Sequence, residues 1–336
     1  MKSSPKYSTH RARLFALLAA MLAAAAALSL ALGPVGVPLG EVLRALFSGD
    51  DASAAARIVV YARAPRTAGC ILAGASLAVA GAITQSVLAN PLASPGTVGV
   101  NAGAGLAAAI CCAIAPDSLA LVPAAAFAGA MAAAMLVLFI AERTGASRIT
   151  LVLAGVAVSN ILAALVDAVV TFAPDALNAY ADFRIGSLES LSMERLAWPA
   201  AAAAVGLAAA FSLTNELDVL SLGGETARGL GMDAGRMRVL LLAVAAALAG
   251  ATVSFAGLLG FVGLVTPHIM RRFSGGEARA LLPACALGGA VLLLVCDTAS
   301  RLVFAPYELP VGITLSLIGG PFFIWLLLRQ RRGRTA

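Results

Sequence analysis

Lysine is almost absent from this chain of 336 residues and occurs only as Lys2 and Lys6. A phosphate-binding loop of the GxxxxGK(S/T) type needs a lysine beside the phosphates, so the chain is not expected to bind ATP through that motif. The sequence also lacks an HExxH zinc motif, a GxSxG nucleophile with partners and a GxGxxG loop after a strand. It therefore does not support an enzyme, and no cofactor is expected.

Charge is scarce too, and the cysteines lack the spacing of a metal site. Only 12% of the residues are charged, and the basic ones flank apolar runs instead of forming a stripe, which argues against a nucleic-acid surface. The cysteines are interpreted as small buried side chains, and no metal or disulfide is expected. They are Cys70, Cys111, Cys112, Cys285 and Cys296.

The chain does contain long apolar runs: 61% of its residues are hydrophobic and its mean hydropathy is +0.95. One soluble core cannot bury so much apolar surface, so the sequence predicts an all-α integral membrane protein. The runs are residues 14–32, 63–89, 97–115, 119–141, 149–172, 196–213, 237–259, 281–303 and 309–328. Residues 261–272 are too few to cross roughly 30 Å of hydrocarbon, which predicts a short or re-entrant helix and about ten transmembrane segments in all.

Two stretches near the start need interpretation. Residues 14–32 follow basic positions and are rich in small residues, as in a signal peptide, but they exceed the usual apolar length, so a retained first helix is favoured. Residues 33–62 are too polar to span. The NPLASPG sequence at 90–96 ends the second helix with two prolines and a glycine.

Basic residues predict the topology. With both termini in the cytoplasm, sixteen of the 23 Lys and Arg residues fall inside and seven outside, in agreement with the positive-inside rule. The chain is then expected to form a single transmembrane domain over 1–336. It has a cytoplasmic tail at 1–13, a helical bundle at 14–328 and a basic cytoplasmic tail at 329–336.

A polar island, ELDVLSLGGETARGLGMDAGRMR at 216–238, interrupts two apolar segments and must lie outside the bilayer. Gly223 and Gly224 signal a turn, Glu225 suits the first turn of a helix, and Gly231 suits its end. The island predicts a short cytoplasmic surface helix over 225–230. An ordinary solvated loop is the alternative.

Polar residues inside the apolar runs are few, so each is informative. Gln85 and Asn160 are interpreted as donors of hydrogen bonds between helices, with pore lining as the alternative. Asp297 and Arg301 are spaced to pair on one helix face, either to anchor that helix or for function. Asp167 is the one serious candidate for an ion-linked group.

Small residues are dense in the spans, as in AGASLAVAGA at 73–82, and predict close helix packing unless they reflect a compositional bias. His268 follows Pro267 at a helix end, where capping or packing is favoured over catalysis.

Five stretches together resemble the FecCD permeases, the membrane subunits of bacterial type II ABC importers for iron-siderophores, haem and vitamin B12. They are residues 63–105, FRIGSL at 183–188, LGGETARGLGM at 222–232, GLLGFVGLVTPHIMRR at 257–272 and residues 296–329. The resemblance covers nearly the whole chain beyond the first helix and implies a BtuC-like permease fold.

The resemblance also implies partners: a second permease subunit, identical or a sister, a cytoplasmic ATP-binding subunit and a periplasmic solute-binding protein. ATP would be hydrolysed by the partner subunit. The island then matches the family's coupling helix, whose movement would shift the bundle between inward- and outward-facing states. The residues implied to seat in the ATPase are Gly224, Glu225, Ala227, Leu230 and Gly231.

On the outer face, Arg63, Arg66 and Arg301 match arginines that receive two glutamates of the binding protein, and as exposed charges they would set encounter rate and register. Phe183 stands where many members carry Trp, and Arg184 adds an unusual charge, both in the expected outer loop. We expect the translocation path near Gln85, Asn90 and Asn160.

The function expected from these features is a permease of the bacterial inner membrane that imports a ferric siderophore. Haem and cobalamin are alternatives within the same class. An ion-coupled secondary carrier that uses Asp167 is the alternative from another class.

Overall fold

The computed structural model describes residues 5–48, 53–116, 119–144, 147–303, 305 and 307–332, and these residues form helices and turns without a strand. The first half contains α1 (Pro5–Ala31), α2 (Leu39–Ser48), α3 (Ala54–Arg57), the π-helical turn η1 (Ile58–Arg63), α4 (Ala64–Leu88), the 3-10 turn η2 (Pro95–Val98), α5 (Val100–Ile114), the 3-10 turn η3 (Leu119–Leu121), α6 (Val122–Arg143) and α7 (Arg148–Phe172). The second half contains α8 (Ala176–Ile185), α9 (Met193–Ser212), α10 (Thr214–Ser221), α11 (Gly224–Gly229), α12 (Ala234–Ala256), α13 (Val262–Ser274), α14 (Ala278–Val303) and α15 (Val311–Arg332).

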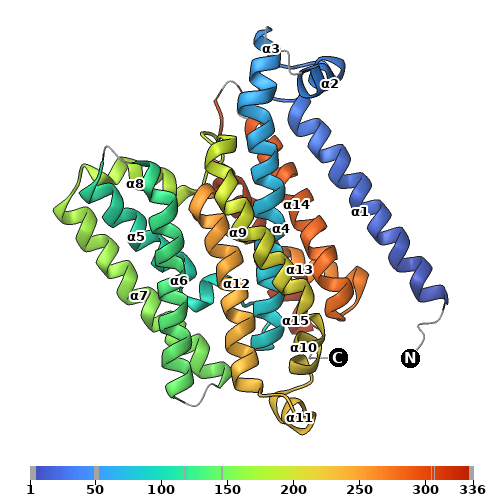
Figure 1. Cartoon of the computed structure of the whole chain (residues 1–336), viewed down its shortest axis with the longest axis vertical. Helices are drawn as coiled ribbons and strands as arrows, with labels where there is room; N and C mark the ends of the chain where they lie inside the picture. The colour runs from blue at the N-terminus through green and yellow to red at the C-terminus, as the bar shows by residue number, and fades with distance from the viewer. Residues whose placement is uncertain are drawn as a thin grey trace.

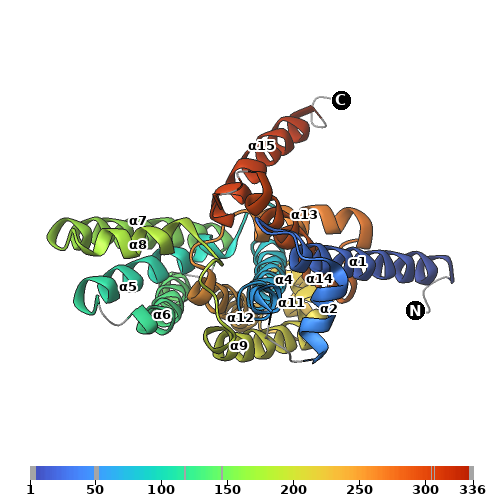
Figure 2. The ribbon, with the colours of Figure 1, turned by 90° about the horizontal axis from the view of Figure 1, so that it is seen from above.

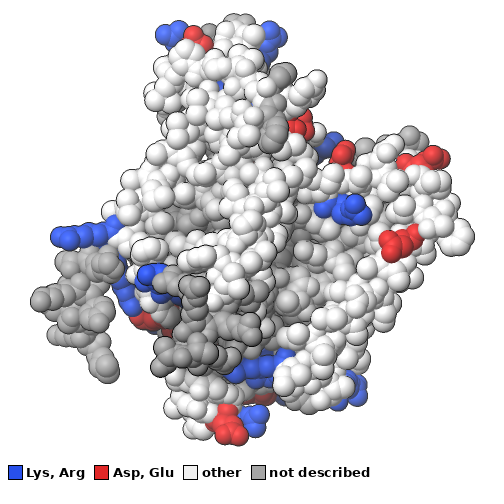
Figure 3. Space-filling model, turned by 180° about the vertical axis from the view of Figure 1, so that it is seen from behind, with Lys and Arg blue, Asp and Glu red and all other residues white. Residues whose placement is uncertain are grey.

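Seven stretches of the described residues are long and apolar enough to cross a membrane: Arg11–Ala31, Ala54–Leu88, Val122–Arg143, Arg148–Phe172, Met193–Ser212, Ala234–Ala256 and Ala278–Val303. Two shorter apolar helices, Val100–Ile114 and Val311–Leu326, and the short α13 complete the segments expected from the sequence. The prediction of an all-α membrane protein is confirmed. Helix α13 is short as expected, but two further apolar helices are also shorter than a full span. Charged side chains lie at the top and bottom of the view and near its left and right margins, and much of the remaining surface is uncharged (Figure 3).

Several boundaries differ from the prediction. Helix α1 begins at Pro5, so positions 5–13 of the expected tail are helical, and α15 continues past 328 to Arg332. Both extensions are polar, because a helix can continue beyond its apolar, membrane-spanning part. Positions 1–4 and 333–336 of the expected tails lie outside the described residues.

The second membrane helix begins nine residues before the predicted Arg63. Ser53 caps its start, because its side chain accepts a hydrogen bond from the Ala56 backbone N–H. Pro65 lacks a backbone N–H and would break a regular helix, but the π-turn η1 lies directly before it, so the chain stays helical from Ala54 to Leu88. The loop after α4 begins where predicted, with Ala89 in a left-handed conformation at φ 46°.

Helices α8 and α10 were not expected, because they are too short and too polar to register as apolar runs. Phe183 and Arg184 therefore lie on α8 and not in an outer loop. The carbonyl of Phe183 accepts from the Leu258 N–H at 3.0 Å, and the carbonyl of Gly186 accepts from the Gly312 N–H at 3.2 Å. These bonds bring the ends of α8 and α12 and the start of α15 together.

Helix α4 lies at the centre of the bundle and packs against α9, α12, α13 and α14 (Figure 1). Helices α5, α6, α7 and α8 form a lobe on one side, and α1 lies on the other. Seen from above, α15 extends away from the bundle (Figure 2). The molecule therefore has a packed centre flanked by more exposed helices.

Glycines set how closely α4 approaches its neighbours. A Cβ on Gly74 would lie 2.3 Å from the carbonyl oxygen of Gly289 on α14. A Cβ on Gly81 would lie 1.8 Å from the carbonyl oxygen of Gly263 on α13. Because real Cβ atoms do not approach so closely, these crossings need glycine, and the expected close packing by small residues is found here.

Gly81→Ala should destabilise the protein by about 1–3 kcal/mol, because the new methyl group forces α4 and α13 apart. Thermal unfolding of the purified protein in detergent measures the effect. The control is Gly40→Ala in α2, where no atom lies within 4 Å of the new Cβ. Equal unfolding midpoints for the two variants would contradict this account of the crossing.

Candidate functional site

The polar island at 216–238 folds as α10 and α11 followed by the start of α12. Helix α11, Gly224–Gly229, agrees with the predicted helix to within one residue at each end. Gly223 precedes it at φ 113° and Gly231 follows it at φ 83°, both in the region that favours glycine. The solvated-loop alternative is therefore wrong.

Hydrogen bonds at the end of α11 fix its last turn. The Met232 N–H donates to the Ala227 carbonyl at 3.0 Å, and the Gly231 N–H donates to the Arg228 carbonyl at 2.9 Å. This pair of bonds is the Schellman arrangement, which satisfies carbonyls that a helix end otherwise leaves unpaired. The predicted role of Gly231 as the helix-terminating residue is confirmed.

The face of α11 that points away from the bundle is available to a partner. Ala227 is fully buried and anchors the helix, whereas Glu225, Leu230 and Gly231 are exposed. Helix α11 lies at the same end of the molecule as the start of α1 and the end of α15 (Figure 1). The coupling residues implied by the resemblance thus share one short helix and its terminating turn.

Helix α10 replaces the loop expected at the start of the island. Leu217 and Leu220 are buried, and α10 packs against α4, α14 and α11. On the same helix, Asp218 Oδ1 accepts a hydrogen bond from the Ala278 N–H of α14 at 2.8 Å. Burial raises the pKa of the Asp218 carboxyl, and the bond from Ala278 opposes that shift. Sequence reasoning missed this residue because its partner lies 60 positions away.

At the opposite end of the molecule, two of the predicted docking arginines hold the end of α1. Arg63 donates to the carbonyls of Leu30 and Ala31, each at 2.8 Å, and to the carbonyl of Val35. Arg301 donates to the Leu32 carbonyl at 3.1 Å and to the Ser29 carbonyl at 3.2 Å. Cations at a helix C-terminus pair with its unsatisfied carbonyls and oppose its dipole.

Arg66 belongs to a buried ion network that connects α4 and α14. Its Nε lies 2.9 Å from Asp297 Oδ1, and its Nη1 lies 2.5 Å from Glu308 Oε2. Asp297 also lies 3.2 Å from Arg301 Nε, so the predicted pairing of these two residues is confirmed. Asp297 is 0% exposed and therefore depends on these two cations.

The expectation that the three outer arginines are exposed is wrong. Arg63, Arg66 and Arg301 are all buried, and their guanidinium groups bond within the chain. The arginines sit where the ends of α1, α4 and α14 meet, and sequence could not show that carbonyls and acids already surround them. A docking role for them stays a prediction.

The three predicted path residues lie in different surroundings, although the Asn90 N–H donates to the Gln85 carbonyl at 3.1 Å. Gln85 is buried between α4 and α13, where its Oε1 accepts from Arg271 Nη1 and its Nε2 donates weakly to the Leu264 carbonyl at 3.3 Å. The interpretation of Gln85 as an interhelical hydrogen-bond partner is thus confirmed. Asn90 is half-buried and caps its own turn, since its Oδ1 accepts from the Leu92 N–H at 2.9 Å.

Asn160 lies on an exposed face of α7. Asp167 and Thr171 follow it at helical spacing on that face, and all three are exposed. The opposite face packs into the lobe through Leu151 and Val158. A carboxylate on a membrane-spanning helix is costly against lipid, so this face points toward water or another subunit.

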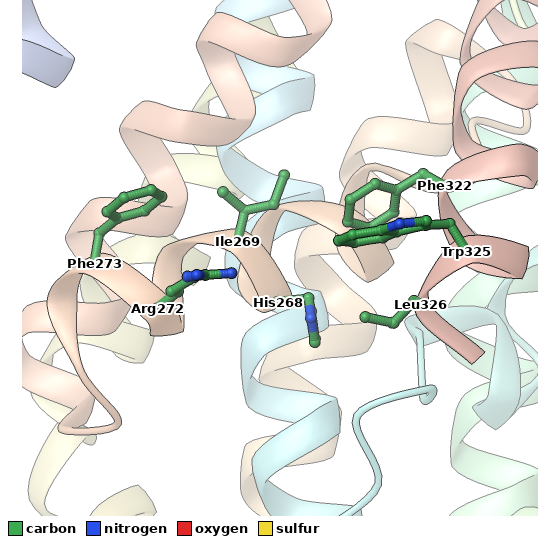
Figure 4. Close-up of a pocket in the computed structure, with 7 residues that line it drawn as sticks. All are labelled: His268, Ile269, Arg272, Phe273, Phe322, Trp325 and Leu326. Carbon is green, nitrogen blue, oxygen red and sulfur yellow. The ribbon is translucent and has the colours of Figure 1, made fainter. Parts of the chain in front are cut away.

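A cavity of about 620 Å³ lies between α13 and α15. Aromatic and aliphatic side chains form most of its wall, with His268 and Arg272 at its border (Figure 4). The His268 ring stands edge-on to Phe322, with ring centres 6.4 Å apart, which agrees with a packing role. The predicted position at a helix end is wrong, because α13 continues through Pro267 and His268 to Ser274. The cavity is an apolar recess beside the outlying helix α15.

Within the described part of the chain, no three His, Cys, Asp or Glu side chains are placed to hold a metal ion. The cysteines lie in α4, α5 and α14, mostly buried among apolar side chains. Their interpretation as small buried side chains agrees with these positions.

Comparisons with known proteins cover nearly the whole chain. Residues 18–329 match the model of the FecCD transport family. The chain is 38% identical to the Fe(3+)-citrate import system permease protein YfmE of Bacillus subtilis (strain 168), over 99% of each chain. It is 35% identical to the hemin transport system permease protein HmuU of Yersinia pestis, over 91% of this chain and 94% of that protein.

One solved structure is similar along almost its entire length. It is described as an inward-facing conformation of a metal-chelate type ABC transporter, and it superposes with a TM-score of 0.84 and 25% identity. The match covers 94% of this chain and 99% of that one. The BtuC-like permease fold expected from the sequence is confirmed.

Asp297→Ala should cost about 3–5 kcal/mol of stability, because it leaves Arg66 and Arg301 buried without their shared counter-ion. Glu277→Ala is the control: it removes an acid that pairs with Arg11 at 2.6 Å with both side chains well exposed, and should cost about 0.2–1 kcal/mol. Thermal unfolding in detergent compares the variants. If both cost the same, Asp297 does not hold together the ends of α4 and α14 that lie opposite α11.

Proposed function

This chain belongs to the FecCD transport family, and we propose that it is the permease subunit of an ATP-binding-cassette importer for a ferric siderophore. The match of residues 18–329 to that family carries the proposal. The short surface helix α11 at one end of the bundle supports it. The importer would lie in the bacterial inner membrane, with α11 and both termini in the cytoplasm. The whole chain, 1–336, would act as one permease domain.

We propose that a separate ATP-binding subunit hydrolyses ATP and receives α11. Exposed Glu225 and Leu230 supply the contact surface, Ala227 anchors the helix, and Gly224 and Gly231 bound it. Closure of the ATP-binding subunits would displace this short helix as a unit. The glycine turns at both ends of α11 support that role. They hold α11 as a defined helix, which can transmit a displacement, whereas a flexible loop would deform.

A second permease subunit would pack on the side where α7 and α15 lie exposed (Figure 2). Both helices carry large exposed apolar residues, among them Leu153 and Ile161 on α7 and Leu317 and Ile324 on α15. Such surfaces in a membrane protein face lipid or another subunit, and the polar face of α7 cannot face lipid. The translocation path would then run between the subunits, past Asn160, with Asn90 near one end and Gln85 bracing α4 behind it.

A solute-binding protein would deliver the cargo to the outer end. Docking onto Arg63, Arg66 and Arg301 requires acidic groups of that protein to reach buried guanidinium groups. Glu308, only 22% exposed at its side chain, already holds Arg66. An acidic partner would therefore have to take the place of Glu308.

The cargo proposed is an iron complex, since the similar permeases named above import ferric citrate and haemin. A ferric siderophore is the first choice, and haem or cobalamin the alternatives. An ion-coupled carrier is a second candidate function, because Asp167 is exposed on a membrane-spanning helix.

Uptake by proteoliposomes tests the function. The chain is reconstituted with a cognate ATP-binding subunit and binding protein, and iron-loaded siderophores, haem and labelled cobalamin are offered separately, with and without internal ATP. Uptake of one ligand that needs ATP is expected. Uptake driven by an ion gradient without ATP would overturn the importer and favour the carrier.

Glu225→Arg should leave the protein in the membrane but reduce ATP-driven uptake and stimulated ATP hydrolysis at least about tenfold. The reversed charge opposes the α11 dipole by only about 0.3–1 kcal/mol, so the loss would come mainly from the partner contact. Glu194→Arg, in the first turn of α9 at the opposite end, is the matched control and should transport normally. Unchanged uptake in Glu225→Arg would remove α11 from the ATPase contact.

A further inference from the structure

Asp218 joins two helices that lie far apart in the sequence. It sits on α10, and its Oδ1 accepts from the N–H of Ala278, the first residue of α14, at 2.8 Å. The start of a helix carries unpaired N–H groups and a positive partial charge, so a carboxylate is favourable there. Asp218 therefore caps α14 from another element.

Asp233 provides a contrast within the same region. Its Oδ1 accepts from the N–H groups of Gly235 and Arg236, each at 3.1 Å, and so caps the helix that it precedes. Such a local cap stabilises one helix. The Asp218 cap also fixes the position of α10 relative to α14.

Helix α11 reaches the bundle through its neighbours in the chain. It packs against α10 and α12, and α10 in turn packs against α4 and α14. Leu217 and Leu220 on α10 are buried in that contact. A displacement of α11 can therefore reach α14 through α10, and Asp218 lies at the contact between α10 and α14.

Helix α14 extends from this contact to the outer end of the molecule. Its 26 residues span about 39 Å at 1.5 Å per residue. Near its far end, Asp297 holds Arg66 of α4, and at the middle its backbone touches α4 at Gly289. Movement at Ala278 would thus shift α14 and α4 together.

Partial burial makes it costly to keep the Asp218 carboxyl ionised. Burial raises the pKa of its carboxyl, with Glu277 adding to that shift and Arg279 opposing it. The bond from Ala278 offsets part of this cost, and it joins the α10–α11 segment to α14.

We propose that Asp218 is a positioning residue that transmits the displacement of α11 to α14 during transport. This inference rests on the proposed function, in which an ATP-binding subunit moves α11. Without the bond, α10 could move relative to α14, and ATP would be hydrolysed without a matching movement of the bundle.

The test is the number of ATP molecules hydrolysed per iron complex imported, measured in proteoliposomes of the full complex. Asp218→Ala should raise this ratio about tenfold, since a bond to a charged acceptor is lost. Asp218→Asn keeps an oxygen acceptor without the charge and should raise it roughly threefold. Asp233→Ala removes a local cap and an exposed ion pair with Arg236 on the same helix, and it should keep the wild-type ratio.

The outcomes separate this inference from the proposed function. If the wild-type complex imports no iron complex with ATP, the proposed function fails. If it does, a wild-type ratio in Asp218→Ala overturns the role of Asp218 alone. Should that variant fail to assemble, a wild-type ratio in Asp218→Asn overturns it instead. An equal rise in Asp233→Ala would also overturn it, because loss of any helix cap would then explain the effect.

Discussion

Helix α4 touches α14 and α13 backbone to backbone, and the rest of the bundle is arranged around these crossings. Gly74 faces Gly289, and Gly81 faces Gly263, at separations that leave no room for a Cβ. In lipid there is no hydrophobic drive to hold helices together, so close contact and polar bonds must do so. Because α4, α13 and α14 pack this tightly, they are placed to move as one body.

Polar groups strengthen this centre at both ends. At the end opposite α11, Asp297 holds Arg66 and Arg301, and with Arg63 these arginines fasten the end of α1. At the other end, Arg271 of α13 bonds to Gln85 of α4. These buried contacts are tolerated because each charge finds a partner, which removes most of the cost of leaving water. The more exposed helices α7 and α15 lie outside this framework, where another subunit can pack.

Much of the site could be predicted from the sequence, because the features that define it lie within single segments. Gly223 and Gly231 bound α11 in backbone conformations that favour glycine, and Glu225 suits its first turn. The limits of α11 were therefore predicted to within one residue. The pairing of Asp297 with Arg301 followed from helical spacing. The exposure predicted for the outer arginines was wrong, because carbonyls of α1 and the acid Glu308 come from distant segments.

The sequence by itself determined that the chain is helical and lies in a membrane, and which surface helix α11 forms. It also located most membrane segments to within a few residues, although the first and second helices each begin nine residues before the predicted position. Each of these depends on hydropathy, turn residues or spacing within one segment. The tertiary structure alone decided that Gln85 braces α13, that the arginines are buried, and that Asp218 caps α14. Such contacts join residues far apart in the chain, and their existence depends on how whole helices pack, which no local pattern encodes.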